Sequence, residues 1–299
     1  MNDDKHPDPV IFGEVLFDCF PDGNSVLGGA PFNVAWHLQA FGLSPLVISG
    51  VGDDELGESV TRAMQDWNMN TAGLQIDSVH PTGSVDIEFD DGEPRYTIVE
   101  NRAYDHIKAE SLPATAEDCL LYHGSLALRN DASRQALAKL KADHSGIVFM
   151  DVNLRDPWWQ RAFVLELVGD ADWVKLNEDE LRQLGSNERS TEAQARAFMQ
   201  DHALTGLVVT LGASGAVALT ADGRQASAAP PQALEVVDTV GAGDAFTSVL
   251  ILGITHQWPL ELTMQRAQNF AALIVGKQGA TVHDPGFYRT MIHDWQLDV

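Results

Sequence analysis

Runs of β-forming apolar residues alternate with amphipathic helical patterns along most of this chain, and this alternation constrains the fold most strongly. Two of the runs, at 147–150 and 207–209, are continuously apolar, as expected for strands that helices cover on both faces. Repeated strand–helix–strand order requires parallel strands joined by crossover helices. The sequence therefore predicts a doubly wound, mostly parallel α/β sheet with helices on both faces.

The expected elements can be placed by their residue ranges. We expect strands at 10–20, 46–51, 119–123, 146–152, 172–176, 206–211 and 216–220, and helices at 32–41, 55–68, 132–141, 192–200, 245–253 and 260–275. No internal repeat, low-complexity tract or linker divides the chain. We therefore expect one α/β domain over residues 1–299.

Residues 82–105 interrupt this alternation of strands and helices. Apolar and polar residues alternate there around Asp91 and Gly92, which predicts a β-hairpin whose apolar face carries Val85, Ile87 and Phe89. No crossover helix follows, so the hairpin is expected to project as a small antiparallel flap. The pattern fits equally a lid over a site and a surface hairpin without function.

Charge and cysteine content exclude several classes of protein. With 43 acidic and 19 basic residues the net charge is −24, which argues against a nucleic-acid or anionic-membrane surface but permits a small anionic ligand. The two cysteines, Cys19 and Cys119, form neither a disulfide framework nor a metal-ligand spacing. The polar beginning of the chain and the lack of a long apolar stretch predict a soluble cytoplasmic protein.

The segment at 238–246, DTVGAGDAF, carries the most specific chemistry. Gly241 and Gly243 allow a tight turn whose free N–H groups point outward at a helix start, which makes an anion site. Asp244 lies in the first turn beside that site, where a carboxylate can accept a proton from an attacking hydroxyl group. The alternative is a glycine-rich turn in which Asp244 only favours the helix N-terminus.

A second segment, GGAPFNVA at 28–35, places paired glycines before a helix and Asn33 in its first turn. The glycines permit close approach of a ligand to the backbone, and the Asn33 amide offers both donors and acceptors. Taken alone, the segment is better explained as a loop entering a helix that Asn33 caps.

Together the two segments resemble the signatures of the ribokinase-like (PfkB) carbohydrate kinase family, GG-x-x-x-N-x-A and D-T-x-G-A-G-D. Further similarities are spread along the chain, at Gly13-Glu14, Asp18, residues 151–155 (DVNLR), residues 177–180 (NEDE) and residues 210–212 (TLG). The resemblance therefore covers nearly the whole chain. It implies a ribokinase-like fold with a lid formed by residues 14–28 and 82–105.

The resemblance also implies a role for individual residues. Asp244 corresponds to the catalytic base, and Gly241, Ala242 and Gly243 correspond to the anion hole that stabilises the transferred phosphoryl group. The expected sugar ligands are Asp18, Gly28, Gly29, Asn33 and Arg155, and the expected nucleotide contacts are Asn177, Thr210, Gly212 and Asn269. Glu180 would organise Mg²⁺ through water, and Asp238 with the Val240 carbonyl and the Gly279 region would border a K⁺ site in family members that have one.

Two basic residues are open to more than one interpretation. Arg155 follows a buried strand at the edge where α/β proteins bind ligands, which favours a ligand contact over an ion pair with one of the many acids. Lys277 fits either a nucleotide contact or a solvated side chain. No Walker A sequence is present, consistent with phosphate held by the GAGD loop.

Within the family the chain resembles the fructokinases, which implies transfer of the γ-phosphoryl group of ATP, with Mg²⁺, to the 6-hydroxyl of D-fructose. Aminoimidazole riboside, 2-keto-3-deoxygluconate and ribose are the alternative acceptors. The apolar face of the flap needs a partner, either the sugar cleft or another flap, and the family implies a homodimer formed through the lids.

Two other classes of protein were weighed. A non-catalytic sugar sensor would be expected to lack Asp244 or Gly243, and both are present. A dinucleotide-dependent oxidoreductase would need G-x-G-x-x-G after the first strand, where Gly13-Glu14 and Asp18 stand instead.

Overall fold

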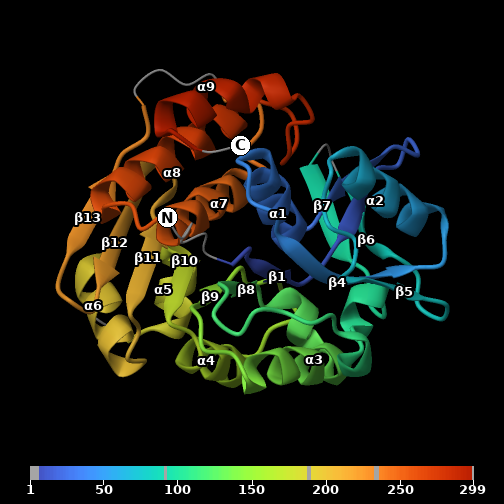
Figure 1. The fold of residues 1–299 in the computed structure, drawn as a ribbon, viewed down its shortest axis with the longest axis horizontal. Helices are drawn as coiled ribbons and strands as arrows, with labels where there is room; N and C mark the ends of the chain where they lie inside the picture. Colours follow the sequence, from blue (N-terminus) through green and yellow to red (C-terminus); the bar gives the residue numbers. More distant parts are fainter. Residues whose placement is uncertain (1–6, 91–92, 187–189, 232–235, 298–299) are drawn as a thin grey trace, which may run out of the picture.

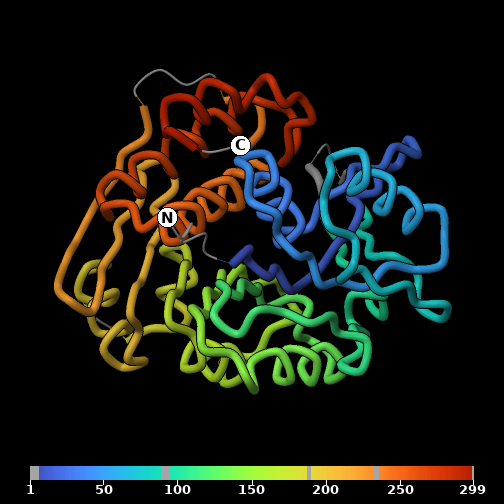
Figure 2. The backbone as a smooth tube through the Cα atoms, viewed as in Figure 1, coloured from blue at the N-terminus to red at the C-terminus, as the bar shows by residue number. Residues whose placement is uncertain are grey.

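A nine-stranded sheet forms the centre of the protein in the computed structural model, which describes residues 7–90, 93–186, 190–231 and 236–297 (Figures 1 and 2). The strand order is β13-β12-β11-β10-β9-β8-β1-β4-β5. Seven strands are parallel, while β12 and β13 pair antiparallel at one edge. The strands are β1 (Val10–Phe12), β4 (Leu46–Gly52), β5 (Leu74–Asp77), β8 (Leu121–His123), β9 (Val148–Asp151), β10 (Trp173–Asn177), β11 (Gly206–Thr210), β12 (Ala216–Thr220) and β13 (Gln225–Ala228). The predicted doubly wound α/β fold is confirmed.

Helices cover both faces of this sheet (Figure 1). Side chains packed on one face come from α1 (Ala30–Ala40), α2 (Glu55–Asp66), α7 (Ala242–Thr255), α8 (Leu260–Val275) and α9 (Pro285–Trp295). Those on the other face come from α3 (Asp131–Ala142), α4 (Arg161–Gly169), α5 (Glu178–Leu184) and α6 (Thr191–Asp201). Short 3₁₀ helices are η1 (Ala103–His106), η2 (Ala109–Ser111), η3 (Leu126–Arg129) and η4 (Gly212–Ser214).

The strands build two hydrophobic cores because successive side chains point to opposite faces. In β9, Phe149 packs on the α7 face, whereas Val148 and Met150 pack on the α4 face. In β11, Val208 packs on the α7 face and its neighbours pack on the other. This explains why the strands read as continuous apolar runs.

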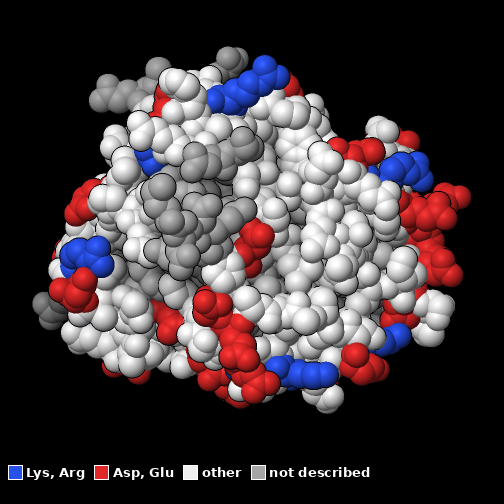
Figure 3. Space-filling model, in the orientation of Figure 1, with Lys and Arg blue, Asp and Glu red and all other residues white. Residues whose placement is uncertain are grey.

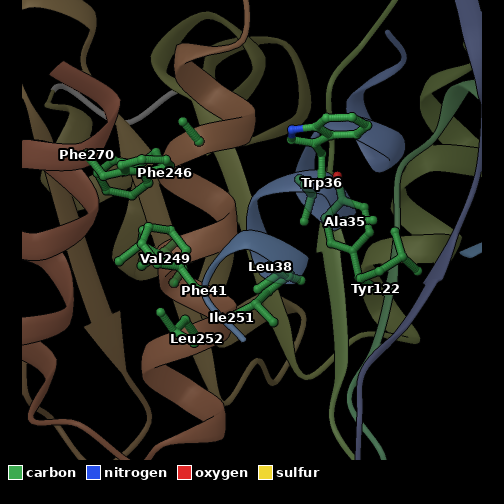
Figure 4. Packing of buried hydrophobic residues seen from close by; sticks show 14 of the residues in the cluster. Ala35, Trp36, Leu38, Phe41, Tyr122, Phe246, Val249, Ile251, Leu252 and Phe270 are labelled. Carbon is green, nitrogen blue, oxygen red and sulfur yellow. The ribbon is translucent and has the colours of Figure 1, made fainter. Parts of the chain in front are cut away.

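Helix α7 is largely buried, and every residue from Ala245 to Gly253 is buried. Figure 4 shows its side chains packed towards Phe270 of α8 and towards Phe41 beside α1. Each such large apolar side chain contributes about 1.5–3 kcal/mol when fully buried. This packing fixes the start of α7, and hence the GAGD segment, against the sheet.

The apolar run at 10–20, predicted as one strand, is two strands in different sheets. The chain leaves the large sheet after β1, at Gly13, and enters a four-stranded sheet of order β3-β2-β6-β7. A Cβ on Gly13 would lie 2.4 Å from the Cγ atom of Pro31, so this exit point packs tightly against the start of α1. The second sheet contains β2 (Leu16–Cys19), β3 (Ser25–Gly28), β6 (Gly83–Asp90) and β7 (Glu93–Ile98).

This second sheet fits the predicted lid, with one change in topology: β2 and β6 are parallel, while the other two pairings are antiparallel. Val85 and Ile87 are buried, and Val85 packs with Leu16 and Tyr104 of the same chain. On the same face Val26 and Tyr96 are 44% and 59% exposed. The predicted turn at Asp91-Gly92 and the Phe89 side chain lie outside the described residues.

Several elements escaped the sequence patterns: α4, α5, α9, β3, β5 and β13. All of the strands among them are four residues long, too short for a period-2 pattern, and α5 has only seven residues. Within the described ranges no helix is both long and apolar enough to cross a membrane. On the face drawn in Figure 3, acidic side chains outnumber the scattered basic ones, as the net charge of −24 implies.

Candidate active site

The GAGD segment forms the beginning of α7. Gly241 is the N-cap residue with φ of 77°, a left-handed conformation that glycine adopts without strain. A Cβ on Gly241 would lie 2.4 Å from the Cα of Ala280, so the close approach of the backbone at Ala280, after α8, also requires glycine at this position. The first α-helical bond runs from the Ala245 N–H to the Gly241 carbonyl, while the Ala242 N–H donates to the Thr239 carbonyl at 3.4 Å. A helix start of this kind, with its N–H groups and the helix dipole, can bind an anion.

Asp244 lies in the first turn of α7 and meets the N-terminal glycine-rich segment. Its Oδ2 atom accepts a hydrogen bond of 2.8 Å from the Nδ2 atom of Asn33. Burial, with a smaller contribution from the charge of Asp151, raises the pKa of Asp244 to about 6, although the Asn33 hydrogen bond and the charges of Lys175 and Arg155 act in the opposite direction. A carboxyl group with this pKa is a base poised just below neutral pH.

Gly28 and Gly29 join the lid to α1. Gly28 ends β3, and Gly29 is the N-cap of α1 with φ of 105°. A Cβ on Gly29 would lie 2.6 Å from the Glu14 carbonyl oxygen, so the glycine lets the start of α1 press against the segment after β1. Asp18 lies on β2, with Leu16 of the same strand paired to Gly28. Burial raises the pKa of Asp18, and Arg155 counteracts that increase.

Glu14 is a carboxyl group of this region that the sequence-based site did not include. Its side chain is buried and its Oε2 atom has no hydrogen-bond partner among the described residues. Burial, with a smaller contribution from the charge of Asp244, raises its pKa to about 7, although its own backbone N–H and the charge of Arg155 act in the opposite direction. The available signal was an acidic residue inside the apolar run at 10–20, because carboxyl groups are rarely buried without a partner.

Arg155 follows β9 and is exposed. Among the described residues no carboxylate oxygen lies within 4 Å of its guanidinium, so the ion-pair interpretation lacks a partner. Its charge nevertheless acts on Asp18, Glu14 and Asp244, which places it on the side of the site that faces the lid.

Asn177 and Glu180 form a reciprocal cap at the start of α5. The Asn177 side chain accepts from the Glu180 N–H, while Glu180 Oε2 accepts from the Asn177 N–H at 2.8 Å. Glu180 Oε1 accepts from the Leu154 N–H at 2.7 Å, which ties α5 to the segment that carries Arg155. The N-x-x-E spacing thus has a structural role, and its role at the nucleotide and Mg²⁺ stays a prediction.

The residues expected at the nucleotide lie on separate elements. Thr210 ends β11, and Gly212 starts η4 with φ of 57° and open space where a Cβ would stand. Asn269 is exposed on α8, and in the described part of the chain no hydrogen bond connects it to either residue. Lys277 is exposed, with Nζ 5.4 Å from the centre of the Phe287 ring.

Asp238 connects the two segments expected around a monovalent cation. Its Oδ1 atom accepts from the Val240 N–H at 3.0 Å, and its Oδ2 atom accepts from the Gly279 N–H at 3.1 Å. The Asp238 carboxylate therefore holds the turn before α7 against the loop after α8. This arrangement brings Val240 and the Gly279 region together, as the prediction required.

A buried ion pair beneath the GAGD segment also escaped sequence reasoning. Lys175 of β10 and Asp151 of β9 are 7% and 2% exposed, with Nζ and Oδ2 2.7 Å apart. The sequence feature that could have indicated this ion pair is the lysine inside the apolar strand sequence WVKL, because a buried lysine needs an acidic partner.

A cavity of about 270 Å³ lies beyond the end of β7, and neither Asp244 nor any other residue of the predicted site lines it. Its lining includes Glu100, Asp105, Arg129, Arg134 and Trp158. Arg129 is engaged there by Asp105, through Nε–Oδ1 and Nη2–Oδ2 distances of 2.7 and 2.8 Å.

Comparisons with known proteins show which proteins this chain resembles in sequence and in fold. The family model of the pfkB family carbohydrate kinases matches residues 19–285. A fructokinase of Escherichia coli is 29% identical over 290 residues, which cover 90% of this chain and 94% of that protein. The structure of a Vibrio cholerae fructokinase bound to fructose, ADP and calcium is similar, with a TM-score of 0.78, 28% identity, and coverage of 93% of this chain and 95% of the other.

A second solved structure is similar over almost the same length. Aminoimidazole riboside kinase from Salmonella enterica, complexed with its riboside and an ATP analogue, has a TM-score of 0.81 and 25% identity. The similarity covers 95% of this chain and 99% of that one.

Proposed function

Because the chain belongs to the pfkB family of carbohydrate kinases and is therefore a sugar phosphotransferase, we propose that it phosphorylates the 6-hydroxyl of D-fructose at the expense of MgATP. The named relative that binds fructose supports this choice of acceptor. We propose the residues around Asp244 as the active site and the four-stranded sheet as its lid.

The observation that carries the proposal is the hydrogen bond between Asn33 and Asp244. It joins the glycine-rich segment at the lid, which would bind the sugar, to the carboxylate beside the anion site. A sugar hydroxyl held by Asn33 and Asp18 would lie next to both Asp244 and the N-terminus of α7. Proximity of acceptor, base and anion site is what direct phosphoryl transfer requires.

In the proposed reaction the sugar 6-oxygen attacks the γ-phosphorus of ATP in line with the leaving group. The bond between the γ-phosphorus and the bridging oxygen breaks, its electron pair stays on ADP, and Asp244 takes the hydroxyl proton. The N–H groups of residues 241–243 oppose the charge on the transferred group. The lid would exclude water, which otherwise competes as the acceptor.

Glu180 fits the proposed water-mediated role at Mg²⁺. Its carboxylate is buried and both of its oxygens accept backbone N–H bonds, so it is held firmly while lone pairs remain for water. No group of three or more potential ligands for a metal occurs in the described ranges, whereas Mg²⁺ commonly takes one or two carboxylates with waters and substrate phosphates. When bound, Mg²⁺ neutralises charge on those phosphates.

Aminoimidazole riboside is the second candidate acceptor. The kinase for this riboside has a TM-score of 0.81 to the present chain, so the scaffold alone does not discriminate between the two substrates. Asp244 and the anion loop would act identically on either primary hydroxyl group. The choice therefore depends on hydroxyl contacts near Asp18, Asn33 and Arg155.

The test is production of ADP with MgATP and each candidate acceptor, measured beside the Asp244→Asn variant. We expect saturable turnover with fructose and a loss of about 100- to 10,000-fold in the variant. Turnover with aminoimidazole riboside but not with fructose would identify the riboside as the acceptor. If no sugar or nucleoside gives ADP production, the interpretation as a non-catalytic sugar sensor would be favoured.

A further inference from the structure

The buried pair Lys175 and Asp151 faces the same side of the sheet as the GAGD segment. In β10, Val174 and Leu176 pack on the α4 face, so Lys175 between them points to the α7 face. In the same way Met150 and Val152 pack on the α4 face and leave Asp151 on the other side. The two residues are direct partners in the parallel register of β9 and β10.

Thr247 connects this pair to the beginning of α7. Its hydroxyl lies 2.9 Å from Asp151 Oδ2 and 2.9 Å from the Gly243 carbonyl oxygen. A Cβ on Gly243 would lie 3.6 Å from Lys175 Nζ, with no closer neighbour. The lysine ammonium therefore lies immediately beside the anion loop, under the glycine that has no side chain to separate them.

The Lys175 ammonium has more donors than this pairing uses. An ammonium carries three N–H donors, and within the described ranges Asp151 is its one hydrogen-bond acceptor. The Lys175 side chain is 9% exposed, so the remaining donors are not satisfied by bulk solvent. The ammonium can therefore donate to an anion held at the neighbouring GAGD segment without losing its bond to Asp151.

We propose that Lys175 is a phosphate ligand of this active site. Asp151 positions the ammonium through the ion pair, and the ammonium donates to the γ-phosphoryl group beside residues 241–243. The inference rests on the proposed kinase function and adds a cation to its anion hole. Helix α7 supplies only partial positive charge at its N-terminus, and Lys175 supplies a full unit.

The surroundings keep Lys175 charged. Burial alone would lower its pKa, but the charge and hydrogen bond of Asp151 raise it, and Asp244 and Glu180 raise it further. The ammonium thus balances several carboxylates in the absence of nucleotide. When a γ-phosphoryl group binds, the same charge is available to it without reorganisation of the protein.

The alternative is that Lys175 and Asp151 only brace β9 and β10 against α7. The double variant Asp151→Asn/Lys175→Met separates the two interpretations, because it removes both charges together and leaves no unpaired buried ion. Lys141→Met is the matched control, since Lys141 forms another ion pair, to Asp170 at 3.1 Å, away from the site. Circular dichroism and thermal unfolding establish that each variant is folded.

The decisive readout is nucleotide affinity without any sugar, measured by calorimetry with Mg²⁺. We expect the double variant to bind the non-hydrolysable imido analogue of ATP at least 10-fold more weakly, with ADP affinity changed less than 3-fold. We also expect kcat to fall about 100-fold, the usual loss for one donor to a developing charge. The Lys141→Met control is expected to match the wild type.

A folded double variant that binds both nucleotides as the wild type does, or weakens both equally, would overturn the proposal. This binding assay requires no acceptor. If fructose is the wrong acceptor, the wild type would show no turnover with it. The affinities for the ATP analogue and for ADP would still test the role of Lys175.

Discussion

Asn33 donates a hydrogen bond of 2.8 Å to Asp244, although 211 positions separate the two residues in sequence. The bond lowers the pKa of a carboxyl group that burial raises to about 6. One amide thus contacts the base and occupies the position expected of a sugar ligand. In the proposed site, binding of the acceptor and ionisation of the base would be coupled through this single side chain.

The pH dependence of turnover should report this bond. The base must be ionised, so kcat/KM should fall as the pH decreases through about 6. In Asn33→Ala the opposing hydrogen bond is gone, and we expect the acidic limb to move to higher pH by about one unit, with a raised KM for the sugar. If the acidic limb of the kcat/KM profile stays at the same pH in this variant, Asn33 does not lower the pKa of Asp244.

Asp244→Asn should stabilise the folded protein while it abolishes turnover. The pKa is raised from 3.8 to about 6 on folding, so ionised Asp244 destabilises the native state above pH 6, and this penalty disappears as the pH falls towards 3.8. We expect denaturant unfolding at pH 8 to give a gain of up to about 3 kcal/mol, shrinking below pH 6. A variant less stable than wild type at pH 8 would contradict this account.

Gly241→Ala should damage the anion loop beyond the cost of backbone strain. Its Cβ would meet the Cα of Ala280 at 2.4 Å, whereas Gly223, with a similar φ of 87°, has open space around it. We expect Gly223→Ala to lose about 1–2 kcal/mol of stability with turnover retained. Gly241→Ala should lose turnover as well; equal effects in both variants would refute the packing argument.

Monovalent cation activation should depend on Asp238, which joins Val240 to Gly279. We expect K⁺ to raise kcat relative to tetramethylammonium, and Asp238→Ala to abolish that difference. Asp131→Ala, an exposed acid on α3, serves as the control. Activation that survives in Asp238→Ala would place the cation elsewhere.

The lid should carry the dimer contact that was predicted from the sequence. Tyr96 and Val26 are its exposed apolar side chains on the face shared with Val85. We expect light scattering at micromolar concentration to give twice the monomer mass, and Tyr96→Glu to halve it. Val79→Glu, at a 77% exposed position outside the lid, should leave the mass unchanged. A wild-type protein found only as monomer would refute the prediction.

The sequence allowed the layered fold and the two glycine-rich segments to be predicted because both depend on local patterns. Continuous apolar strands and glycines before helices are visible within a few residues. The pairing of Lys175 with Asp151 depends on the register of two strands 24 positions apart, which no local pattern contains. The division of residues 10–20 between two sheets was hidden for a related reason: both strands are apolar, and the break falls at Gly13 without a turn sequence around it.

The position of α7, α8 and α9 at the end of the chain has a consequence for biosynthesis. These helices cover the face of the sheet that displays Ile11, Val47 and Tyr122, all of which leave the ribosome much earlier. Until residue 242 and its successors emerge, the nascent chain carries an uncovered apolar surface on its central strands. Chains ended prematurely before α7 would therefore lack both the base and the cover of the sheet, and are expected to require chaperones or to aggregate.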